Sequence, residues 1–294
     1  MAHNHAHHQH ENEQALGRAF ALISGFMFVE IVGGIFANSL TLLADAGHMF
    51  LDASALAFSW YALRLSRRLE DERLSYGYHR WEVLAAFVNG LTLLALVGWI
   101  LFEAWERLNT PQEMVPLPAL VVASAGFIVN IIAYRWLHSH QEDSAAVKSA
   151  ALHVLGDLLG SVAAITAALI VWTTGWTYAD PLLALVIATI LGRGAWRVLK
   201  DATHILLEGV PDGINLDQIA ETITARVPGV NGVHHLHAWA LTAQKPLLTL
   251  HASVDEPADL SQVMRNIKSV LNDEFGIDHS TVQVDHGTCP DSHS

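Results

Sequence analysis

The sequence predicts an all-α membrane bundle of six transmembrane helices, followed by a small α+β domain. The 294 residues are 52% hydrophobic and only 15% charged, and their mean hydropathy is +0.31. That composition is too apolar for an ordinary soluble protein. Long apolar runs continue up to Lys200, whereas residues 206–294 hold 12 acidic and 4 basic residues. The chain therefore divides into a membrane part and a solvated, acidic part.

Six segments are long and apolar enough to cross a bilayer, which needs about 20 residues. Only Asn38 and Ser39 separate the first two segments, which predicts a tight hairpin. The third and fourth segments each carry an interior polar residue, Asn89 and Asn130. We expect the spans near residues 17–37, 40–63, 83–105, 117–137, 148–173 and 181–199.

Lys and Arg residues gather on one side of these spans. The loop between the second and third spans holds five arginines, and more basic residues flank the fourth-to-fifth loop and the end of the sixth span. The opposite side has Arg107 alone. Because basic loops stay in the cytoplasm, we expect both termini there. The polar, His-rich N-terminus does not have the pattern of a cleavable signal peptide.

After the sixth span the pattern is that of a small soluble domain. A Pro-Asp-Gly turn at 211–213 precedes a predicted helix. The order α-β-β-α-β predicts a compact sheet with helices on one face. We expect a helix at 215–227, strands at 233–241 and 247–255, a helix at 259–275 and a strand at 279–285. The expected regions are a His-rich disordered tail (1–14), the membrane domain (15–204), the cytoplasmic domain (205–286) and a final tail (287–294).

The pattern His-x-x-x-Asp occurs in two predicted spans, as His48 with Asp52 and as His153 with Asp157. Residues four apart share one helix face. Two such helices together offer two imidazoles and two carboxylates, a tetrahedral set suited to zinc. Ionisable groups at membrane depth are costly and indicate an ion pathway. Interhelical hydrogen bonds are the structural alternative, but they do not explain two aspartates, which would balance a divalent cation.

Other polar residues near these spans are weaker candidates. Asp45 precedes His48 by three residues and lies roughly on its face, as a further ligand, a proton acceptor or a structural cap. His79, in the charged loop after the second span, is a possible ligand. We expect three more polar side chains to face the bundle interior as packing or permeation groups, namely Glu30, Asn89 and Asn130.

Histidines also gather outside the spans. Residues 3–10 hold five, a tract that can collect metal loosely, and its irregular spacing argues against a purification tag. In the soluble domain, strand alternation places His235 on the opposite face from His234 and His237. The cluster suggests a regulatory metal site, although any one histidine could equally be exposed or hydrogen-bonded. Its candidate members are His234, His235, His237, His251, His279, Asp285 and His286.

The overall charge limits the partners. A net charge of −13 with 18 histidines argues against nucleic-acid binding and favours a divalent cation. Cys289 is the single cysteine, so no intrachain disulfide can form.

Several stretches resemble the cation diffusion facilitator family, especially its bacterial zinc-efflux branch. They are SLTLLADAGHMFLD, YGYHRWEVLAAFVNG, ALHVLGDLLGSVAA, ADPLLALVIA and VHHLHAWAL, and the resemblance covers the whole chain. It implies a homodimer in the bacterial inner membrane, with six-helix bundles and ferredoxin-like cytoplasmic domains. It also implies that the chain is not an enzyme but exports Zn²⁺, with Cd²⁺ or Co²⁺ as further substrates, in exchange for protons.

The resemblance also assigns residues by position. The transport site matches His48, Asp52, His153 and Asp157. The cytoplasmic ligands of the family match His234, His251, His279 and Asp285, and its ligand near the end of the second-to-third loop matches His79.

Four other functions use the same residues. A membrane-embedded zinc enzyme would need an open coordination position, and the chain has no HExxH motif. A metal sensor would bind zinc without moving it. A haem protein could use His48 and His153 as axial ligands. A zinc importer would have the same fold but move the ion in the opposite direction.

Overall fold

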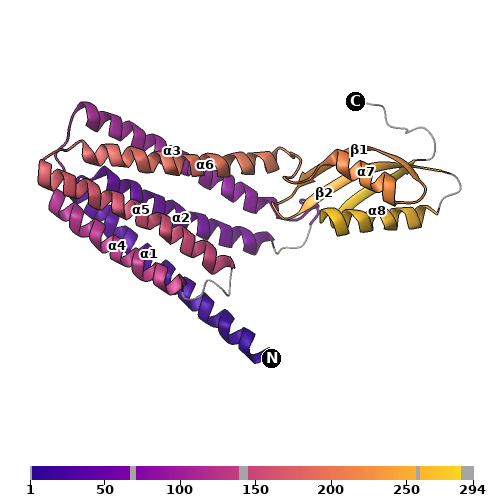
Figure 1. Cartoon of the computed structure of the whole chain (residues 1–294), viewed down its shortest axis with the longest axis horizontal. Helices are drawn as coiled ribbons and strands as arrows, with labels where there is room; N and C mark the ends of the chain where they lie inside the picture. Colours follow the sequence, from indigo (N-terminus) through magenta and orange to yellow (C-terminus); the bar gives the residue numbers. More distant parts are fainter. Residues whose placement is uncertain (1, 67–70, 139–144, 256–258, 286–294) are drawn as a thin grey trace. The chain divides into compact units, whose positions relative to one another are not determined.

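The computed structural model describes residues 2–66, 71–138, 145–255 and 259–285, with side chains left out for 2–17, 52, 55–66 and 145–153. The chain divides into two compact units, Met1–Phe58 with Val88–Arg197, and Ser59–Phe87 with Val198–Ser294. Figure 1 shows the elements in chain order. They are α1 (Ala2–Ala37), α2 (Leu40–Ser66), α3 (Arg80–Asn109), α4 (Pro116–His138), α5 (Ala145–Thr174), α6 (Ala179–Leu206), α7 (Leu216–Arg226), β1 (Val230–Ala240), β2 (Pro246–Val254), α8 (Leu260–Phe275) and β3 (His279–Asp285).

Five predicted spans are confirmed as helices long and apolar enough to cross a membrane. They are Arg18–Ala37, Arg80–Asn109, Pro116–His138, Val154–Thr174 and Ala179–Leu206. The remaining predicted span corresponds to α2, where the apolar stretch within the described side chains is the shorter Leu40–Leu51. Large apolar side chains on these helices are exposed, among them Phe36, Phe102 and Ile190, as lipid-facing positions require.

The N-terminal region differs from the expected disordered tail. Helix α1 begins at Ala2 and includes the His-rich stretch, whose side chains lie outside the described set. Ala, Gln and Glu alternate with the histidines there, and these residues have good helix propensity. Within the described side chains of α1, the apolar stretch Arg18–Ala37 lies inside the predicted first span.

The tight hairpin between α1 and α2 is confirmed. Asn38 adopts the left-handed backbone conformation, with φ of 51°, and the Ser39 N–H donates to the Gly34 carbonyl at 3.0 Å. Leu43 of α2 packs directly on Gly34, where an added Cβ would approach the Leu43 side chain to 3.0 Å. The missing side chain at Gly34 therefore lets the two helices pack closely at the turn.

Small residues join the helices into two packed groups that share α2. Helices α1, α4 and α5 pack side by side, with Ala37, Ala123, Ala164 and Ala168 fully or almost fully buried (Figure 1). A second cluster joins α2 to α3 and α6. Its buried members are Leu40, Ala44, Val97, Ile100, Ala104, Ala184, Ile187 and Ala188. Close packing of small side chains is what holds membrane helices together in lipid.

The soluble elements occur in the predicted order. The sheet has the order β1-β2-β3, antiparallel between β1 and β2 and parallel between β2 and β3. The described residues contain three strands, so the α+β class is confirmed and a ferredoxin-like sheet is not shown. Asn215 caps α7, Asp259 caps α8, and Gly276 ends α8 with a φ of 65°.

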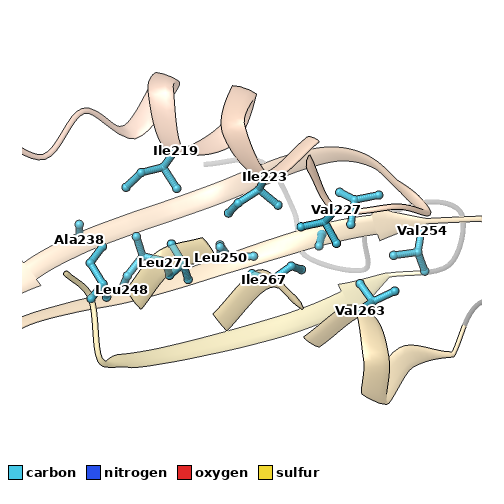
Figure 2. Close-up of a cluster of buried hydrophobic side chains, with 13 residues drawn as sticks. Ile219, Ile223, Val227, Ala238, Leu248, Leu250, Val254, Val263, Ile267 and Leu271 are labelled. Atoms are coloured by element: carbon cyan, nitrogen blue, oxygen red, sulfur yellow. The ribbon is translucent and has the colours of Figure 1, made fainter. Parts of the chain in front are cut away.

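One face of the sheet carries the hydrophobic core of this unit. Alternate residues of β2 point into it, including Leu248, Leu250 and Ala252. Helices α7 and α8 cover them with Ile219, Ile223, Ile267 and Leu271 (Figure 2). The opposite face holds the alternate positions, among them His234, Thr249 and His251. The core therefore directs the histidines to the other side of the sheet.

We predict that Ile267→Ala destabilises the soluble unit by about 2–5 kcal/mol, because Ile267 is completely buried and the change leaves a cavity. Lys268→Ala, on the exposed side of the same helix turn, is the matched control. Hydrogen exchange of the full-length protein should show faster exchange in α7, α8 and the sheet for Ile267→Ala alone. Unchanged protection would contradict this assignment of the core.

Candidate metal sites

The first candidate site lies between α2 and α5. The His48 Nε2 and Asp157 Oδ1 atoms are 4.0 Å apart, and Asp157 is buried while the His48 side chain is 19% exposed. These residues come from the two different His-x-x-x-Asp patterns, so the fold brings one member of each together. Asp52 and His153 occupy the same two helices, but their side chains lie outside the described residues.

A layer of polar side chains lies next to the His48–Asp157 pair, on the side of the α1–α2 hairpin. Asp45 of α2 is 2% exposed and packs against Gly160 of α5, where an added Cβ would collide with the Asp45 carboxylate. Glu30 of α1 is 1% exposed and packs in the same way against Gly126 of α4. Each glycine thus makes room for one buried carboxyl group. No local sequence pattern reveals this role of Gly126 and Gly160, because each carboxyl group comes from a different helix.

The same layer contains two neutral polar groups. The Asn130 side-chain amide of α4 donates to the Ser161 hydroxyl of α5 at 3.3 Å, and both residues are buried. The expectation that Glu30 and Asn130 face the bundle interior is therefore confirmed, whereas Asn89 of α3 is half-buried. Charged forms of Glu30, Asp45 and Asp157 repel one another across this layer. Such a cluster favours occupation by a cation or by protons.

The second candidate site lies on the open face of the sheet. One ring nitrogen from each of His234, His235 and His251 lies within 4.8 Å of the others. The Asp285 Oδ2 atom is 3.3 Å from both His234 Nε2 and His251 Nδ1. His234 and His251 are register partners on β1 and β2, and Asp285 comes from the end of β3. Three strands thus supply three imidazoles and one carboxylate, a ligand set typical of zinc.

The expected orientation of His235 is wrong. The β1–β2 pairing has a register shift between His234 and His237, and His235 has a φ of 47°. Such a β-bulge inserts an extra residue and interrupts the alternation of side chains. The His235 ring consequently lies on the face of its neighbours, with centroids 5.3 Å from His234 and 5.0 Å from His251.

His279 does not join the cluster that the resemblance implied. It begins β3 opposite Leu247, whereas Asp285 ends the strand, and six residues of strand span about 20 Å. The centroid of the His279 ring instead lies 6.2 Å from the centroid of the Tyr76 ring. His235 occupies the place in the cluster that the resemblance had assigned to His279.

The surroundings of His79 also differ from those of a metal ligand. Its Nε2 atom lies 3.0 Å from the Lys245 ammonium nitrogen, so a cation would have to displace Lys245. Within the described side chains, neither His79 nor Asp45 belongs to a group of three close metal-ligating residues.

Comparisons with known proteins agree with a two-part chain. Residues 16–207 match the family model described as the cation efflux transmembrane domain, and residues 211–287 match the cation efflux protein cytoplasmic domain. The chain is 43% identical over its whole length to the zinc transporter ZitB of Pectobacterium atrosepticum, covering 92% of that protein. It is 40% identical over 98% of its length to the metal cation efflux system protein CzcD of Cupriavidus metallidurans, again covering 92%.

Two further similarities concern an antiporter and a solved domain. The cadmium, cobalt and zinc/H(+)-K(+) antiporter of Bacillus velezensis is 35% identical over 97% of this chain, which covers 92% of that protein. A solved structure titled as the metal-bound C-terminal domain of the CzcD transporter matches with 37% identity and a TM-score of 0.23. The match covers 24% of this chain and 99% of that one.

We predict that Gly160→Ala destabilises the membrane unit by about 1–3 kcal/mol, because its methyl group would overlap the buried Asp45 carboxylate. Gly156→Ala in the same helix meets no atom within 4 Å and should leave stability equal or slightly higher. Thermal unfolding of both variants in detergent provides the measurement. Equal melting temperatures would show that α2 and α5 are not closely packed at Gly160.

Proposed function

This chain belongs to the cation efflux family, and we propose that it exports Zn²⁺ from the cytoplasm in exchange for protons. The observation that carries the proposal is the pair of half-buried His48 and buried Asp157 between two helices of the membrane unit. The family and the relatives are metal-cation transporters, which agrees with this function and points away from an enzyme. The family and the CzcD relative are described as efflux proteins, which supports export as the direction.

We assign the transported ion to His48, Asp52, His153 and Asp157. Two ligands of a tetrahedral zinc ion lie about 3.3 Å apart, given zinc–ligand bonds near 2.0 Å. The observed 4.0 Å between His48 Nε2 and Asp157 Oδ1 is slightly wider, so a small approach of α2 to α5 would complete the site. Two carboxylates balance the charge of Zn²⁺, which lowers the cost of moving the ion into the bilayer.

Proton exchange follows from the same ligands. Zinc requires neutral imidazoles and ionised carboxylates, so protons compete with the metal for every ligand. Histidine titrates near pH 6.5, which makes acid on the receiving side favour metal release. The name of the Bacillus velezensis relative, an H(+)-K(+) antiporter, also supports coupling to protons. An alternating-access cycle would carry zinc outward and protons inward.

We further propose that the cluster on the sheet binds regulatory zinc. His234, His251 and Asp285 provide three ligands, and His235 provides the fourth in place of His279. If this site binds zinc more tightly in the transport-competent state, its occupation would shift the protein toward that state. The cytoplasmic-domain model matched by residues 211–287 supports a homodimer.

The proposed location is the bacterial inner membrane, with several spans and both termini in the cytoplasm. The basic loops on one side support this orientation. The chief alternative is a membrane-embedded metal sensor, which would bind zinc but move neither zinc nor protons.

We predict that His48→Ala and Asp157→Ala each reduce zinc-driven proton flux in proteoliposomes to background, because each removes one ligand. His138→Ala, an exposed histidine at the end of α4, should keep normal flux. Normal flux in either site variant would contradict the assigned site. Zinc binding without flux in the unmodified protein would favour the sensor.

We predict that Asp285→Asn and His251→Ala raise the zinc concentration for half-maximal flux by about tenfold, or 1.4 kcal/mol of binding free energy. His237→Ala is the matched control, because His237 lies on β1 beyond the bulge and is exposed. The maximal flux at saturating zinc should stay unchanged in all three variants. An unaltered dose response for Asp285→Asn would remove the regulatory role.

A further inference from the structure

A buried ionic network joins three helices at the end of the bundle that carries the α1–α2 hairpin. Asp180, in the first turn of α6, is 1% exposed. Its Oδ2 atom accepts a hydrogen bond from the Leu40 N–H at 2.7 Å. Its Oδ1 atom accepts from the Ser39 hydroxyl at 2.7 Å and the Thr41 N–H at 3.2 Å. One carboxylate thus receives three hydrogen bonds from the hairpin.

These contacts make Asp180 an N-terminal cap of α2, in addition to the Ser39 hydroxyl, which accepts from the Leu42 N–H at 3.4 Å. The first N–H groups of a helix have no partner within the helix, and the helix dipole places positive charge there. Such a cap usually comes from the residue just before the helix. Here the carboxylate comes from α6, and the Thr41 hydroxyl also donates to the Asp180 carbonyl at 3.0 Å. The cap therefore attaches the start of α2 to the start of α6.

Arg107, in the last turn of α3, extends this attachment. Its Nη1 atom donates to the Asn38 carbonyl at 2.7 Å and lies 3.8 Å from Asp180 Oδ2. Its Nη2 atom donates to the Asn38 side-chain oxygen at 2.9 Å, and its Nε atom donates to Glu103 at 3.0 Å. Arg107 is 7% exposed, and its guanidinium lies between two carboxylates. Separating buried charges of this kind is costly unless water enters.

The network lies at the start of α2, and the next turns of this helix lead to the proposed transport site. His48 follows Thr41 by seven residues, or about 10 Å along α2. In the first two turns of α2, Leu40 and Ala44 pack without exposed surface against Ile100, Ala104 and Ala184 of α3 and α6. Any movement of this end of α2 must therefore break the cap or carry α6 with it.

We propose that Asp180 is a positioning residue that locks the hairpin end of the bundle closed, and that this lock opens in each transport cycle. We call its members the hairpin lock: Asn38, Ser39, Leu40, Thr41, Arg107 and Asp180. The proposal rests on the proposed function, in whose orientation this end faces away from the cytoplasm. With the lock closed, the His48–Asp157 pair is shielded from that side. With the lock broken, water and protons reach the pair without transport of zinc.

Accessibility of a single cysteine tests the lock. Cys289→Ser removes the native thiol, and Ser161→Cys places a probe at a buried position one turn from Asp157. A membrane-impermeant maleimide is added from outside to intact cells. Asp180→Asn keeps the shape of the side chain but weakens its charge-assisted hydrogen bonds, so labelling should become about tenfold faster. Calorimetry on the purified variant should show zinc affinity within about twofold of the parent, since no ligand is lost.

Two further variants decide the result. Ser39→Ala removes only one of the three hydrogen bonds to the carboxylate and should label at an intermediate rate. Glu113→Gln, an exposed acidic residue near the hairpin, should label like the parent protein. If Asp180→Asn does not fold, Ser39→Ala alone decides the question. A labelling rate equal to the parent in the folded Asp180 or Ser39 variant would overturn the lock.

Zinc flux, measured in proteoliposomes with the same variants, tests the proposed function separately. If the His48→Ala variant keeps the zinc flux of the parent protein, the transport site is refuted. The labelling rates are unaffected by that outcome. Faster labelling of Asp180→Asn with zinc affinity retained and zinc flux lost would support the lock together with the transport function. A purely structural cap predicts loss of protein or of stability, without selective access from outside.

Discussion

A charged group buried among the membrane helices needs a partner, and this requirement shapes the hairpin end of the membrane unit. The penalty for an unpaired charge in a low-dielectric interior is several kcal/mol. At the hairpin end, Asp180 is compensated by Arg107 and by the start of α2. Deeper in the bundle, Asp157 lies beside His48, which a metal ion can bridge. The first pairing joins the ends of helices, and the second lies at the proposed transport site.

Helix α2 depends most on this arrangement. It packs with α1, α4 and α5 through one buried cluster and with α3 and α6 through another. Its first turn is capped by Asp180, and His48 lies two turns further along. Gly160 allows the Asp45 carboxylate to approach α5 closely. A helix attached at one end and carrying ligands in its middle is well placed to couple metal binding to a change at the hairpin.

The two candidate metal sites differ in charge in a way that suits their surroundings. The membrane set has two histidines and two aspartates, so a bound Zn²⁺ gives a neutral site that can exist within a bilayer. The sheet site has three histidines and one aspartate, so a bound Zn²⁺ leaves one positive charge near water. A neutral loaded site suits an ion that must be moved through lipid. A positively charged one can remain bound at the surface of a solvated domain.

Composition and local pattern were enough to predict the class of the fold, because the apolar runs have the length that a bilayer requires. The order of elements in the soluble domain followed from turn residues and strand alternation, and each element ends within three residues of its predicted limit. The two His-x-x-x-Asp patterns were also recognisable as candidate ligands, since each has helical spacing inside a predicted span. These features are local, and a single segment contains the information for each.

Contacts between distant segments decided the rest. The side on which His235 lies depends on a bulge in β1, which strand alternation does not reveal. The exclusion of His279 follows from its place at the far end of β3, and the Lys245 contact of His79 joins residues 166 positions apart. Likewise, Asp180 caps a helix that begins 140 residues earlier in the chain. The sequence by itself determined which segments are apolar enough to cross a membrane and which residues can bind metal. Only the tertiary structure decided which of these residues meet, because that choice depends on helix packing and strand register.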